Sequence, residues 1–501
     1  MRSGQRVLAC APSNAAVDNL VERLAEVADS SDENGDSVEP IKFVRIGAPE
    51  RISDAALLNS LEARVRDATK GYFDQGRNTR RRELVAATRL GFEKRDEMMS
   101  KKIKNKKALD AKISSLRKEQ RTMAVSGRKT RAKAERDVLQ NANVVLSTTV
   151  GAGAENIQKL PAFDLLVLDE AAQATEPSSW IPLVRAKRVV FVGDPQQLAP
   201  LVRSEEAMRV GLATPIMTRV ALPQQKREVK ELDDSNTTNP SALLSSGVLG
   251  CALGTQYRSH AHISDWASRE SYNGRLYASP SVATGLLRDL PGVVATRATS
   301  SALLLLDTRV ADGSLLGGCG EVTERELLAS LSDYGSFQSD SANENSSKNY
   351  SSLVNEGEAY AVTMHVAGLL RAGLAPSAIA VQSPYAAQVR LMQRRLREAA
   401  RIGLAVGAEL VEVASVDSFQ GREAEAVVVS TVRSNNRNAV GFLSDARRTN
   451  VAVTRARRHV AIVGDSSTVG SDMFLAKLLS HIRENGVASP ADEHKELHEP
   501  L

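Results

Sequence analysis

Short apolar runs that end in polar residues recur in the first part of the chain. The clearest run, LLVL at residues 165–168, continues directly into two carboxylates, Asp169 and Glu170. A continuous apolar run of this length is typical of a strand buried on both faces of a parallel sheet. Comparable runs followed by polar loops occur at residues 6–12, 143–150 and 188–198. Because ligands bind at the carboxyl ends of strands in open α/β folds, we expect these loops to converge on one crevice.

Helical spacing follows the first of these runs. The apolar positions between residues 17 and 27 recur every three or four residues, and Ser13 or Asn14 suits the N-cap. The amides and hydroxyls of such a turn suit a phosphate, although simple capping also explains them. Strand, turn and helix patterns return at residues 378–396, 411–434 and 449–465, which predicts a second α/β region.

Several segments interrupt these patterns. Residues 55–140 are rich in Lys, Arg and Glu with sparse apolar positions, which predicts an αα-hairpin projecting from the body. Residues 205–250 are irregular, and residues 330–352 are a Ser/Asn-rich stretch of low complexity; both are expected to be insertions. The polar residues 486–501 predict a loose C-terminal tail.

The charge distribution singles out the predicted hairpin. The whole chain carries a net charge of +5, but residues 77–136 contain 21 Lys/Arg and 7 Asp/Glu, so this segment carries +14 and the remainder −9. A solvated helix face accounts for many charge runs. So large a local excess nevertheless favours contact with a polyanion such as nucleic acid, without specifying a base sequence.

Composition argues against several other classes of protein. The sequence has no run of about 18 apolar residues, so it predicts no membrane span. Its first residues do not resemble a signal peptide. The cysteines Cys10, Cys251 and Cys319 lack metal-site spacing, which favours a reducing compartment, cytoplasmic or nuclear, over a zinc site or a disulfide framework.

The adjacent carboxylates Asp169 and Glu170 suggest a specific chemistry. Two neighbouring anions at the end of a buried strand are costly without a cation. A magnesium ion with nucleotide phosphates meets this need, because one carboxylate can hold the metal while the next orients an attacking water. A strand that merely ends in a polar loop is the alternative.

Eight motifs occur in one order along the chain. They are CAPSNAAVDNLVERL (10–24), LSTTVGA (146–152), LDEAAQATE (168–176), VGDPQQLAP (192–200), QYRSH (256–260), SPYAAQ (383–388), VDSFQGRE (416–423) and NVAVTRARR (450–458). Their order and spacing resemble those of superfamily 1 helicases of the up-frameshift type, in particular the immunoglobulin mu-binding branch. The resemblance implies two RecA-like domains with parallel sheets, ATP and Mg²⁺ in the cleft between them, and 5′-to-3′ movement on single-stranded DNA or RNA.

The resemblance also implies a domain organisation. The first RecA-like domain would comprise residues 1–54 and 141–204, interrupted by the basic helical insertion at 55–140. The second would comprise residues 251–470, after an irregular insertion at 205–250 and before a C-terminal tail at 471–501.

Family roles transfer to individual positions. Asp169 would hold magnesium, Glu170 would polarise the attacking water, and Gln197 would sense the γ-phosphate. Arg258 and Arg455 match the arginines that neutralise charge on the transferred phosphoryl group, a role that suits the planar guanidinium.

Other positions match nucleotide and strand contacts of the family. Tyr257 would stack on the base of ATP, and Gly421 and Glu423 would touch its γ-phosphate and ribose. The positions that match contacts to the nucleic-acid strand are Ser13, Asn14, Thr148, Thr149, Pro384, Tyr385, Gln388 and Ser418.

Two departures from the family pattern stand out. Ser259 replaces the usual Met in QYRSH, which is expected to alter packing and not chemistry. No G-x-x-x-x-G-K-[ST] phosphate loop occurs in the sequence, and the family places it a few tens of residues before CAPSN. We therefore expect an incomplete copy that hydrolyses ATP poorly; the alternative is an ATP-independent nucleic-acid-binding or regulatory protein that has lost the loop.

Overall fold

The computed structural model describes residues 5–29, 41–72, 75–100, 107–220, 251–309, 317, 319–327, 352–419, 421–493 and 495–500. The chain forms two units. The first comprises Met1–Asp194 and Ala199–Asp234, and the second comprises Pro195–Leu198 and Ser235–Leu501. The predicted insertion at 330–352, apart from Ser352, and most of the one at 205–250 lie outside the described residues. None of the described helices is long and apolar enough to cross a membrane.

A five-stranded parallel sheet forms the core of the first unit, in the order β2-β3-β1-β4-β5. Its strands are β1 (Val7–Ala11), β2 (Phe43–Ile46), β3 (Val144–Thr148), β4 (Leu165–Leu168) and β5 (Val189–Phe191). Cys10 is paired with Leu168, and Ala11 with Thr148. The loops after β1, β3 and β4 therefore leave the sheet at one edge, as the apolar runs predict.

Short helices surround this sheet and its edge. They are α1 (Asn14–Asp29), α2 (Asp54–Leu57), α3 (Leu61–Ala68), α6 (Glu155–Gln158), α7 (Glu176–Leu183), α8 (Glu205–Arg209) and the 3₁₀ turns η2 (Pro49–Arg51), η3 (Gly151–Gly153) and η4 (Ala171–Gln173). The N-cap of α1 is Ser13, whose Oγ accepts from the amide of Ala16 over 3.1 Å. Val17 and Val21 of α1 are fully buried, which confirms the predicted helix.

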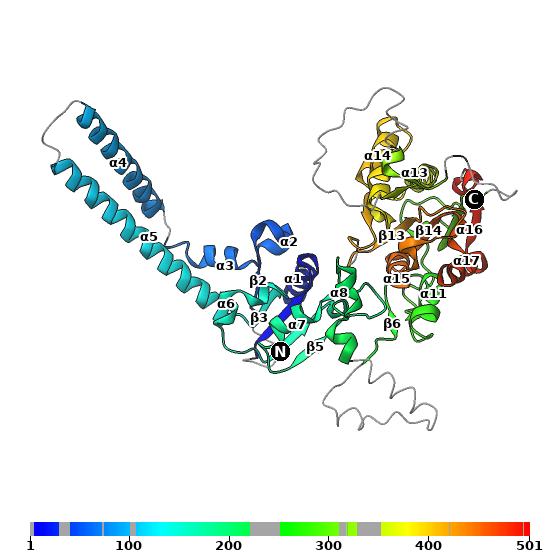
Figure 1. The fold of residues 1–501 in the computed structure, drawn as a ribbon, viewed down its shortest axis with the longest axis horizontal. Coiled ribbons are helices and arrows are strands. Elements are labelled where there is room, and N and C mark those ends of the chain that lie inside the picture. The colour runs from blue at the N-terminus through cyan, green and yellow to red at the C-terminus, as the bar shows by residue number, and fades with distance from the viewer. Residues whose placement is uncertain are drawn as a thin grey trace, which may run out of the picture. The chain divides into compact units, whose positions relative to one another are not determined.

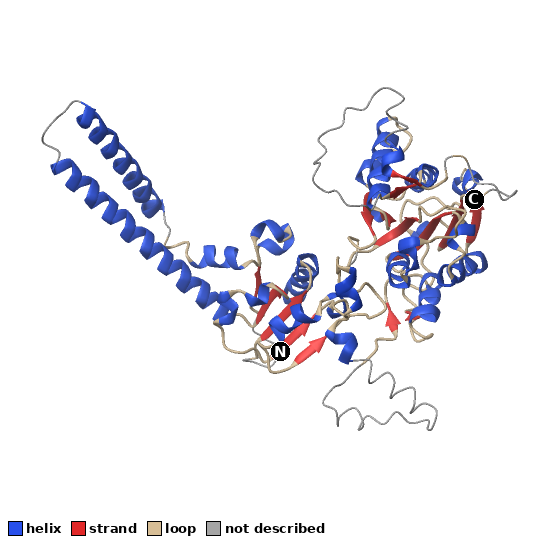
Figure 2. Ribbon diagram, in the orientation of Figure 1, coloured by secondary structure: helices blue, strands red, loops and turns tan. Residues whose placement is uncertain are grey.

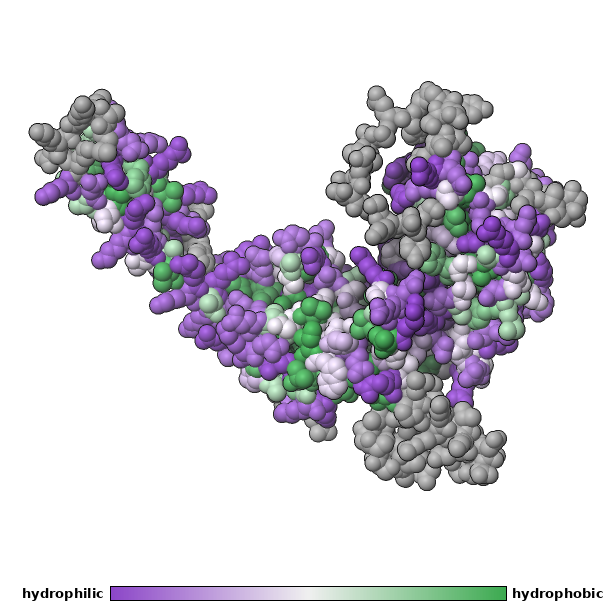
Figure 3. All heavy atoms as spheres, in the orientation of Figure 1, coloured by the Kyte–Doolittle hydropathy of each residue, from purple (hydrophilic) through white to green (hydrophobic). Residues whose placement is uncertain are grey.

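Two long helices, α4 (Gln75–Ser100) and α5 (Lys107–Asn141), form a hairpin in the first unit (Figure 1). Leu84 and Ile113 are buried in it. The side-chain amide of Gln120 donates to the carbonyl oxygen of Leu84 over 2.7 Å and so links the two helices. Most of the visible surface of the hairpin is hydrophilic (Figure 3). The structure thus contains the αα-hairpin that the charge pattern predicts.

A six-stranded parallel sheet organises the second unit, in the order β12-β11-β13-β14-β8-β15. Figure 2 shows strands in red with helices in blue around them. The strands of this sheet are β8 (Leu303–Asp307), β11 (Ile379–Ser383), β12 (Glu412–Ser415), β13 (Ala424–Ser430), β14 (Ala456–Gly464) and β15 (Val487–Pro490). Two small ribbons accompany it, the parallel pair β6 (Thr255–Gln256) and β7 (Tyr277–Ala278) and the antiparallel pair β9 (Val322–Thr323) and β10 (Leu353–Val354).

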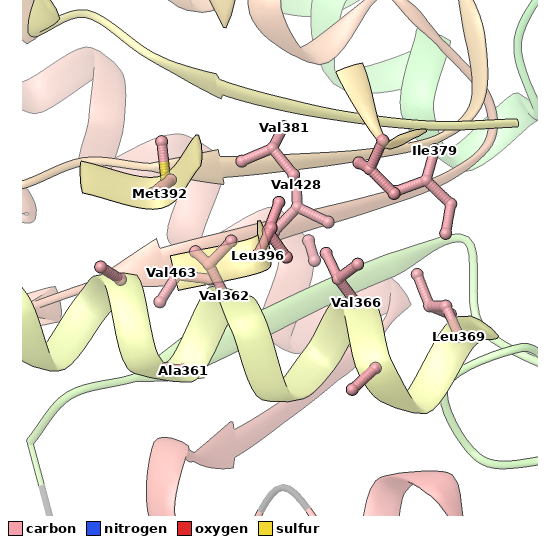
Figure 4. Packing of buried hydrophobic residues seen from close by; sticks show 14 of the residues in the cluster. Ala361, Val362, Val366, Leu369, Ile379, Val381, Met392, Leu396, Val428 and Val463 are labelled. Carbon is pink, nitrogen blue, oxygen red and sulfur yellow. The ribbon is translucent and has the colours of Figure 1, made fainter. Parts of the chain in front are cut away.

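Helices pack on this sheet with aliphatic side chains between them. They are α11 (Ala261–Ser271), α13 (Glu356–Arg371), α14 (Ala386–Arg401), α15 (Ala446–Val453), α16 (Ser466–Val469) and α17 (Met473–Asn485). The 3₁₀ turns are η5 (Leu287–Asp289), η6 (Pro376–Ala378), η7 (Ala408–Leu410), η8 (Gly441–Ser444), η9 (Ala491–Glu493) and η10 (Glu496–His498). Val362 and Val366 of α13 face Val381 and Val428 of the sheet, with Leu396 of α14 nearby (Figure 4). Most of α13 is buried, and its buried residues include the polar side chains of Glu358 and His365 as well as aliphatic ones.

The predicted loose tail is wrong. Val487–Pro490 forms the edge strand β15, which pairs in parallel with β8. Further on, Leu497 is fully buried, and its carbonyl oxygen accepts from the amide of Ala298 over 2.9 Å. Backbone hydrogen bonds to an existing sheet edge do not require an apolar pattern, so the local sequence carries little signal for this strand.

Candidate functional site

Asp169 and Glu170 follow β4 at the edge where the polar loops gather. The amide of Asp169 donates to the carbonyl oxygen of Cys10 over 2.8 Å, so Asp169 still belongs to the β1–β4 ladder. Glu170 then turns the chain with a φ of +50°, in the left-handed region. Residues other than glycine rarely adopt this conformation, and such strain concentrates at functional sites.

Gly193 lies directly against this turn. A Cβ atom at position 193 would lie 2.9 Å from the backbone nitrogen of Ala171 and 3.0 Å from that of Ala172. The preceding residue, Val192, accepts from the amide of Ala171 over 2.8 Å. A side chain at position 193 would therefore displace the turn that orients Glu170.

The electrostatics of Asp169 fit a magnesium ligand. Burial raises the pKa of Asp169, although the hydrogen bond from the Glu170 amide at 2.9 Å and the charge of Arg23 lower it in part. A partly desolvated carboxylate is stabilised in its charged form by a nearby cation. Carboxylate oxygens are also the ligands that Mg²⁺ takes from proteins when it binds nucleotide phosphates.

Gln173 orients the second carboxylate. Its side-chain amide donates to Oε2 of Glu170 from the next turn of the chain. The sequence motif contains Gln173, but its spacing does not reveal that the two side chains meet. This contact appears only because η4 folds Gln173 back over Glu170.

The residues of the first unit that match nucleic-acid contacts of the family occupy the same sheet edge but differ in accessibility. Ser13 is exposed and caps α1. Thr148 is partly buried, and its Oγ1 accepts from the amide of Gly151 over 3.0 Å. Thr149 is buried, and its amide donates to the carbonyl oxygen of Ala11 over 2.9 Å.

Asn14 is oriented by an arginine that sequence reasoning missed. Nη2 of Arg45 donates to Oδ1 of Asn14 over 2.9 Å, while Nε of Arg45 donates to Oδ1 of Asp18 over 2.9 Å. Arg45 lies inside β2 and is fully buried. The sequence signal that could have revealed this role is a charged residue within an apolar strand, because a buried charge requires a partner.

In the second unit, Arg258 meets Glu423. Nε of Arg258 donates to Oε2 of Glu423, and Nε of Arg457 donates to Oε1 of Glu423 over 3.1 Å. Burial alone would raise the pKa of Glu423, but the hydrogen bonds from Arg457 and Arg258 outweigh it and lower this pKa. Glu423 is therefore held ionised between two arginines.

Arg455 meets Gln197, whose segment Pro195–Leu198 groups with the second unit. Nη2 of Arg455 donates to Oε1 of Gln197 over 3.1 Å. Nε of Arg455 donates to the carbonyl oxygen of Val451 over 3.3 Å, and the side chain is almost fully buried. Two predicted site residues from distant motifs are thus neighbours.

The nucleotide-contact candidates of the second unit are open to solvent. The Tyr257 side chain is 71% exposed, as a residue that stacks on a ligand must be before the ligand binds. Gly421 has a φ of +80°, a conformation that a residue with a side chain would adopt only with strain.

The residues of the second unit that match nucleic-acid contacts of the family occupy different environments. Pro384 is partly buried, and Ser418 is exposed. Tyr385 is buried, and its hydroxyl accepts from Nη1 of Arg433 over 3.3 Å. Gln388 is fully buried and bonded within the protein, which differs from the position expected of a direct strand contact.

Gln388 belongs to a buried polar cluster around Glu358. The side-chain amide of Gln388 donates to the carbonyl oxygen of Asn355 over 3.0 Å and to Oγ of Ser430 over 3.1 Å. Ser430 Oγ and the amide of Val432 each donate to Oε2 of Glu358 over 2.7 Å. Desolvation raises the pKa of Glu358 to about 8 despite these donors. The cluster holds Val432 at a φ of +69° where the chain leaves β13.

The residues to which the family resemblance assigns catalytic roles lie in different units. Asp169 and Glu170 belong to the first unit, and Arg258 and Arg455 belong to the second. No group of three or more His, Cys, Asp or Glu that could hold a metal occurs within the described parts of the chain. A single carboxylate with nucleotide phosphates does not require such a group.

Comparisons with known proteins identify the family of the chain. Two family models, each described as an AAA domain, match residues 1–205 and 242–467. The chain is 37% identical over 498 residues to DNA-binding protein SMUBP-2 of Rattus norvegicus. This match covers 99% of the chain and 42% of that protein. The chain is 33% identical over 490 residues to DNA polymerase alpha-associated DNA helicase A of Schizosaccharomyces pombe, covering 97% of the chain and 61% of that protein.

A third relative extends the match to another group. The regulator of nonsense transcripts 1 homolog of Neurospora crassa is 30% identical over 485 residues, which covers 96% of the chain and 35% of that protein. The chain belongs to the superfamily 1 helicases of the up-frameshift type. Within this helicase family it falls in the immunoglobulin mu-binding branch, and its two sheets are those of RecA-like domains. It spans less than two thirds of the length of these relatives.

The structure shows what Ser259 contacts at the position where the family usually has Met. The Ser259 side chain is buried, and its hydroxyl donates to the carbonyl oxygen of Ala456 over 2.7 Å. Gln256 brackets the same turn, because its Oε1 accepts from the amides of Arg258 and Ser259, each over 2.8 Å. Ser259 therefore ties the loop that carries Arg258 to the start of β14.

Proposed function

We propose that this chain is the core of an ATP-dependent helicase that moves 5′-to-3′ along single-stranded DNA or RNA. One observation carries the proposal. Two carboxylates follow β4 at the sheet edge; Asp169 is partly desolvated, and Glu170 is held in a strained turn by Gln173. This arrangement suits hydrolysis of a nucleotide phosphate.

The carboxylates have distinct roles in this proposal. Asp169 holds the Mg²⁺ that accompanies ATP and neutralises phosphate charge. Glu170 accepts a hydrogen bond from the attacking water and orients it. Because Gln173 and the turn fix Glu170, little reorientation is needed when ATP binds.

The arginines supply positive charge to the transferred phosphoryl group. Arg258 and Arg455 match the family positions, and each is pre-positioned by a partner, Glu423 and Gln197 respectively. A guanidinium held in this way contributes roughly 10³–10⁵ in rate when it reaches the phosphoryl group. Tyr257, exposed beside Arg258, provides the surface for the base of ATP.

A chimera tests the proposal. This chain replaces the matching segment of S. pombe DNA helicase A, and ATP-dependent strand displacement is measured on duplexes with 5′ or 3′ single-stranded tails. We expect unwinding from the 5′ tail, and loss of it in Glu170→Gln. If the chimera folds but does not unwind the duplexes, while the parent helicase A does so in the same assay, the proposal is overturned.

Binding by the chain itself distinguishes the alternative. We expect salt-sensitive binding of single-stranded DNA or RNA. Strand binding by the chain together with an inactive, folded chimera would support an ATP-independent nucleic-acid-binding or regulatory protein.

We also propose a cytoplasmic or nuclear location. The three cysteines Cys10, Cys251 and Cys319 are free thiols in the structure, which fits a reducing compartment. Fractionation of cells that express the tagged protein tests this, and recovery from a secretory fraction would contradict it.

A further inference from the structure

A β-bulge interrupts the pairing of β13 with β14 in the second unit. Ala424 of β13 is paired with Ala456 of β14, but the next pair in the register is Ala426 with His459. One residue of β13 therefore faces two residues of β14. Bulges of this kind re-aim side chains and are common beside active sites.

The bulge brings two consecutive arginines to one carboxylate. In a regular strand, neighbouring side chains point to opposite faces of the sheet. Here Nη1 of Arg457 donates to Oε1 of Glu425 over 3.2 Å, and Nε of Arg458 donates to Oε2 of Glu425 over 2.9 Å. Nη1 of Arg458 also donates to the carbonyl oxygen of Leu286 over 3.2 Å, so this end of the cluster is tied to the main chain.

Arg457 also reaches the neighbouring carboxylate, Glu423. Nε of Arg457 donates to Oε1 of Glu423 over 3.1 Å, and Nη2 donates to the same oxygen. The other oxygen of Glu423, Oε2, accepts from Nε of Arg258. Each oxygen of Glu423 thus has its own arginine, and the arginine on Oε1 fixes the direction in which Oε2 points.

The cluster is a network and not a set of separate surface ion pairs. An isolated exposed pair contributes little, but several charges in one network hold their geometry better. Two carboxylates here alternate with three arginines, and each carboxylate accepts from two of them. Burial would raise the pKa of Glu423, but the hydrogen bonds from Arg457 and Arg258 lower it, so Glu423 stays ionised.

We propose that Arg457 is a positioning residue for Arg258 and acts through Glu423. By anchoring Oε1, Arg457 turns Oε2 towards Arg258 and so holds the Arg258 guanidinium ready for the transferred phosphoryl group. Arg458 and Glu425 hold Arg457 in turn. The proposal rests on the proposed function, because it assumes that Arg258 acts on a phosphoryl group. The alternative is a structural role in which Arg457 only joins β13 to β14.

Proton exchange at the Arg258 side chain tests the contact in the full chain. The Nε–H signal of Arg258 is followed by NMR in arginine-labelled protein and is assigned by its loss in Arg258→Lys. Because Glu423 accepts this proton, its exchange with water should be slow in the wild type and faster in Arg457→Ala. Arg457→Lys keeps the charge but not the forked donors, so it should give an intermediate rate.

Catalysis and its pH dependence are measured in the helicase A chimera. Arg457→Ala should lower kcat by roughly tenfold, because Arg258 is no longer held in position. The pKa of Glu423 should rise in this variant, since a hydrogen bond that lowers it is lost, and protonated Glu423 no longer attracts Arg258. The acid limb of the pH profile of kcat should therefore move to higher pH. Arg457→Lys should move it back, because the positive charge is restored, whereas a structural role alone would not move it.

Arg401→Ala is the matched control. Arg401 lies on α14 in the same unit, is exposed, and is paired with Glu398 over 2.7 Å. Its removal deletes the same charge and should leave kcat, the acid limb and the exchange at Arg258 unchanged. Arg458→Ala should cause a smaller loss than Arg457→Ala, because Arg457 keeps its contact with Glu423.

The outcomes separate this proposal from the proposed function. An active wild-type chimera in which Arg457→Ala changes neither the exchange at Arg258 nor the acid limb would overturn the positioning role and leave the proposed function standing. Equal effects of Arg401→Ala would also overturn it, since a general loss of charge would then explain them. An inactive wild-type chimera would contradict the proposed function and this proposal with it, even where Arg457→Ala speeds the exchange at Arg258.

Discussion

Nε of Arg45 donates to Oδ1 of Asp18 over 2.9 Å, and both side chains are buried. The pair joins β2 to α1, and the other carboxylate oxygen of Asp18 accepts from the amide of Ser53 over 2.8 Å. Removing one partner of a buried pair leaves an uncompensated charge, which costs about 3–5 kcal/mol. The pair therefore matters for the stability of the sheet edge that carries Asn14.

Asp18→Ala should lower the opening free energy of the first unit by about 3–5 kcal/mol. Hydrogen exchange followed by mass spectrometry measures this in β2, with β13 of the second unit as an internal reference. Glu155→Ala, which removes an exposed partner of Lys159 in the first unit, should change this free energy by less than about 0.5 kcal/mol. Equal effects of the two substitutions would show that the buried pair is not special.

Glu358→Gln should alter the pH dependence of stability in the second unit. Burial raises the pKa of Glu358 to about 8, whereas its ordinary value is 4.5. The folded form holds the proton and the unfolded form releases it, so the wild type loses stability as pH rises from about 5 to about 8. Gln cannot titrate, so the variant should gain stability relative to the wild type across this window, by up to about 1.4 kcal/mol per pH unit.

Tryptophan fluorescence measures this difference. The chain has two tryptophans, and Trp266 is buried in the second unit whereas Trp180 lies in the first. In a Trp180→Phe background, urea unfolding of the second unit is followed through Trp266. A stability difference between variant and wild type that stays constant with pH would rule out titration of Glu358.

Glu170→Gln should lower ATP turnover of the helicase A chimera by roughly 10²–10⁴-fold, because it removes the group that accepts the proton of the attacking water. Gln173→Ala should cause a smaller loss, since Glu170 keeps its charge but loses its orienting donor. Steady-state turnover with saturating single-stranded DNA measures both. Strand binding should be unchanged in each variant, and a matching loss of strand binding would instead indicate misfolding of the sheet edge.

Ser259→Ala should destabilise the second unit by about 1 kcal/mol, because it leaves the buried carbonyl of Ala456 without the hydroxyl that donates to it. Ser259→Met, the usual family residue, should cost about 1–3 kcal/mol by overpacking. Urea unfolding monitored through Trp266 measures both. Ser444→Ala removes an exposed hydroxyl and should change stability by less than about 0.5 kcal/mol. A Met variant more stable than the wild type would show that the site has room for the longer side chain.

The local sequence determined the regular elements and the chemistry of the motif loops. Apolar runs at β1, β3 and β4 and the spacing of Val17 and Val21 in α1 are short-range patterns, and each directly reflects burial. The Lys/Arg-rich stretch likewise predicted the hairpin, because long charged helices bury little surface and need few distant partners.

Tertiary structure alone decided which side chains meet. The pairs Arg45–Asn14, Arg258–Glu423 and Gln388–Ser430 join residues 31, 165 and 42 positions apart, and no periodicity encodes such pairings. The edge strand β15 also depends on an existing partner, β8, because so short a segment becomes a strand only when a sheet offers it backbone hydrogen bonds. The sequence thus specified the groups available for chemistry, while packing determined which of them are exposed, oriented or buried.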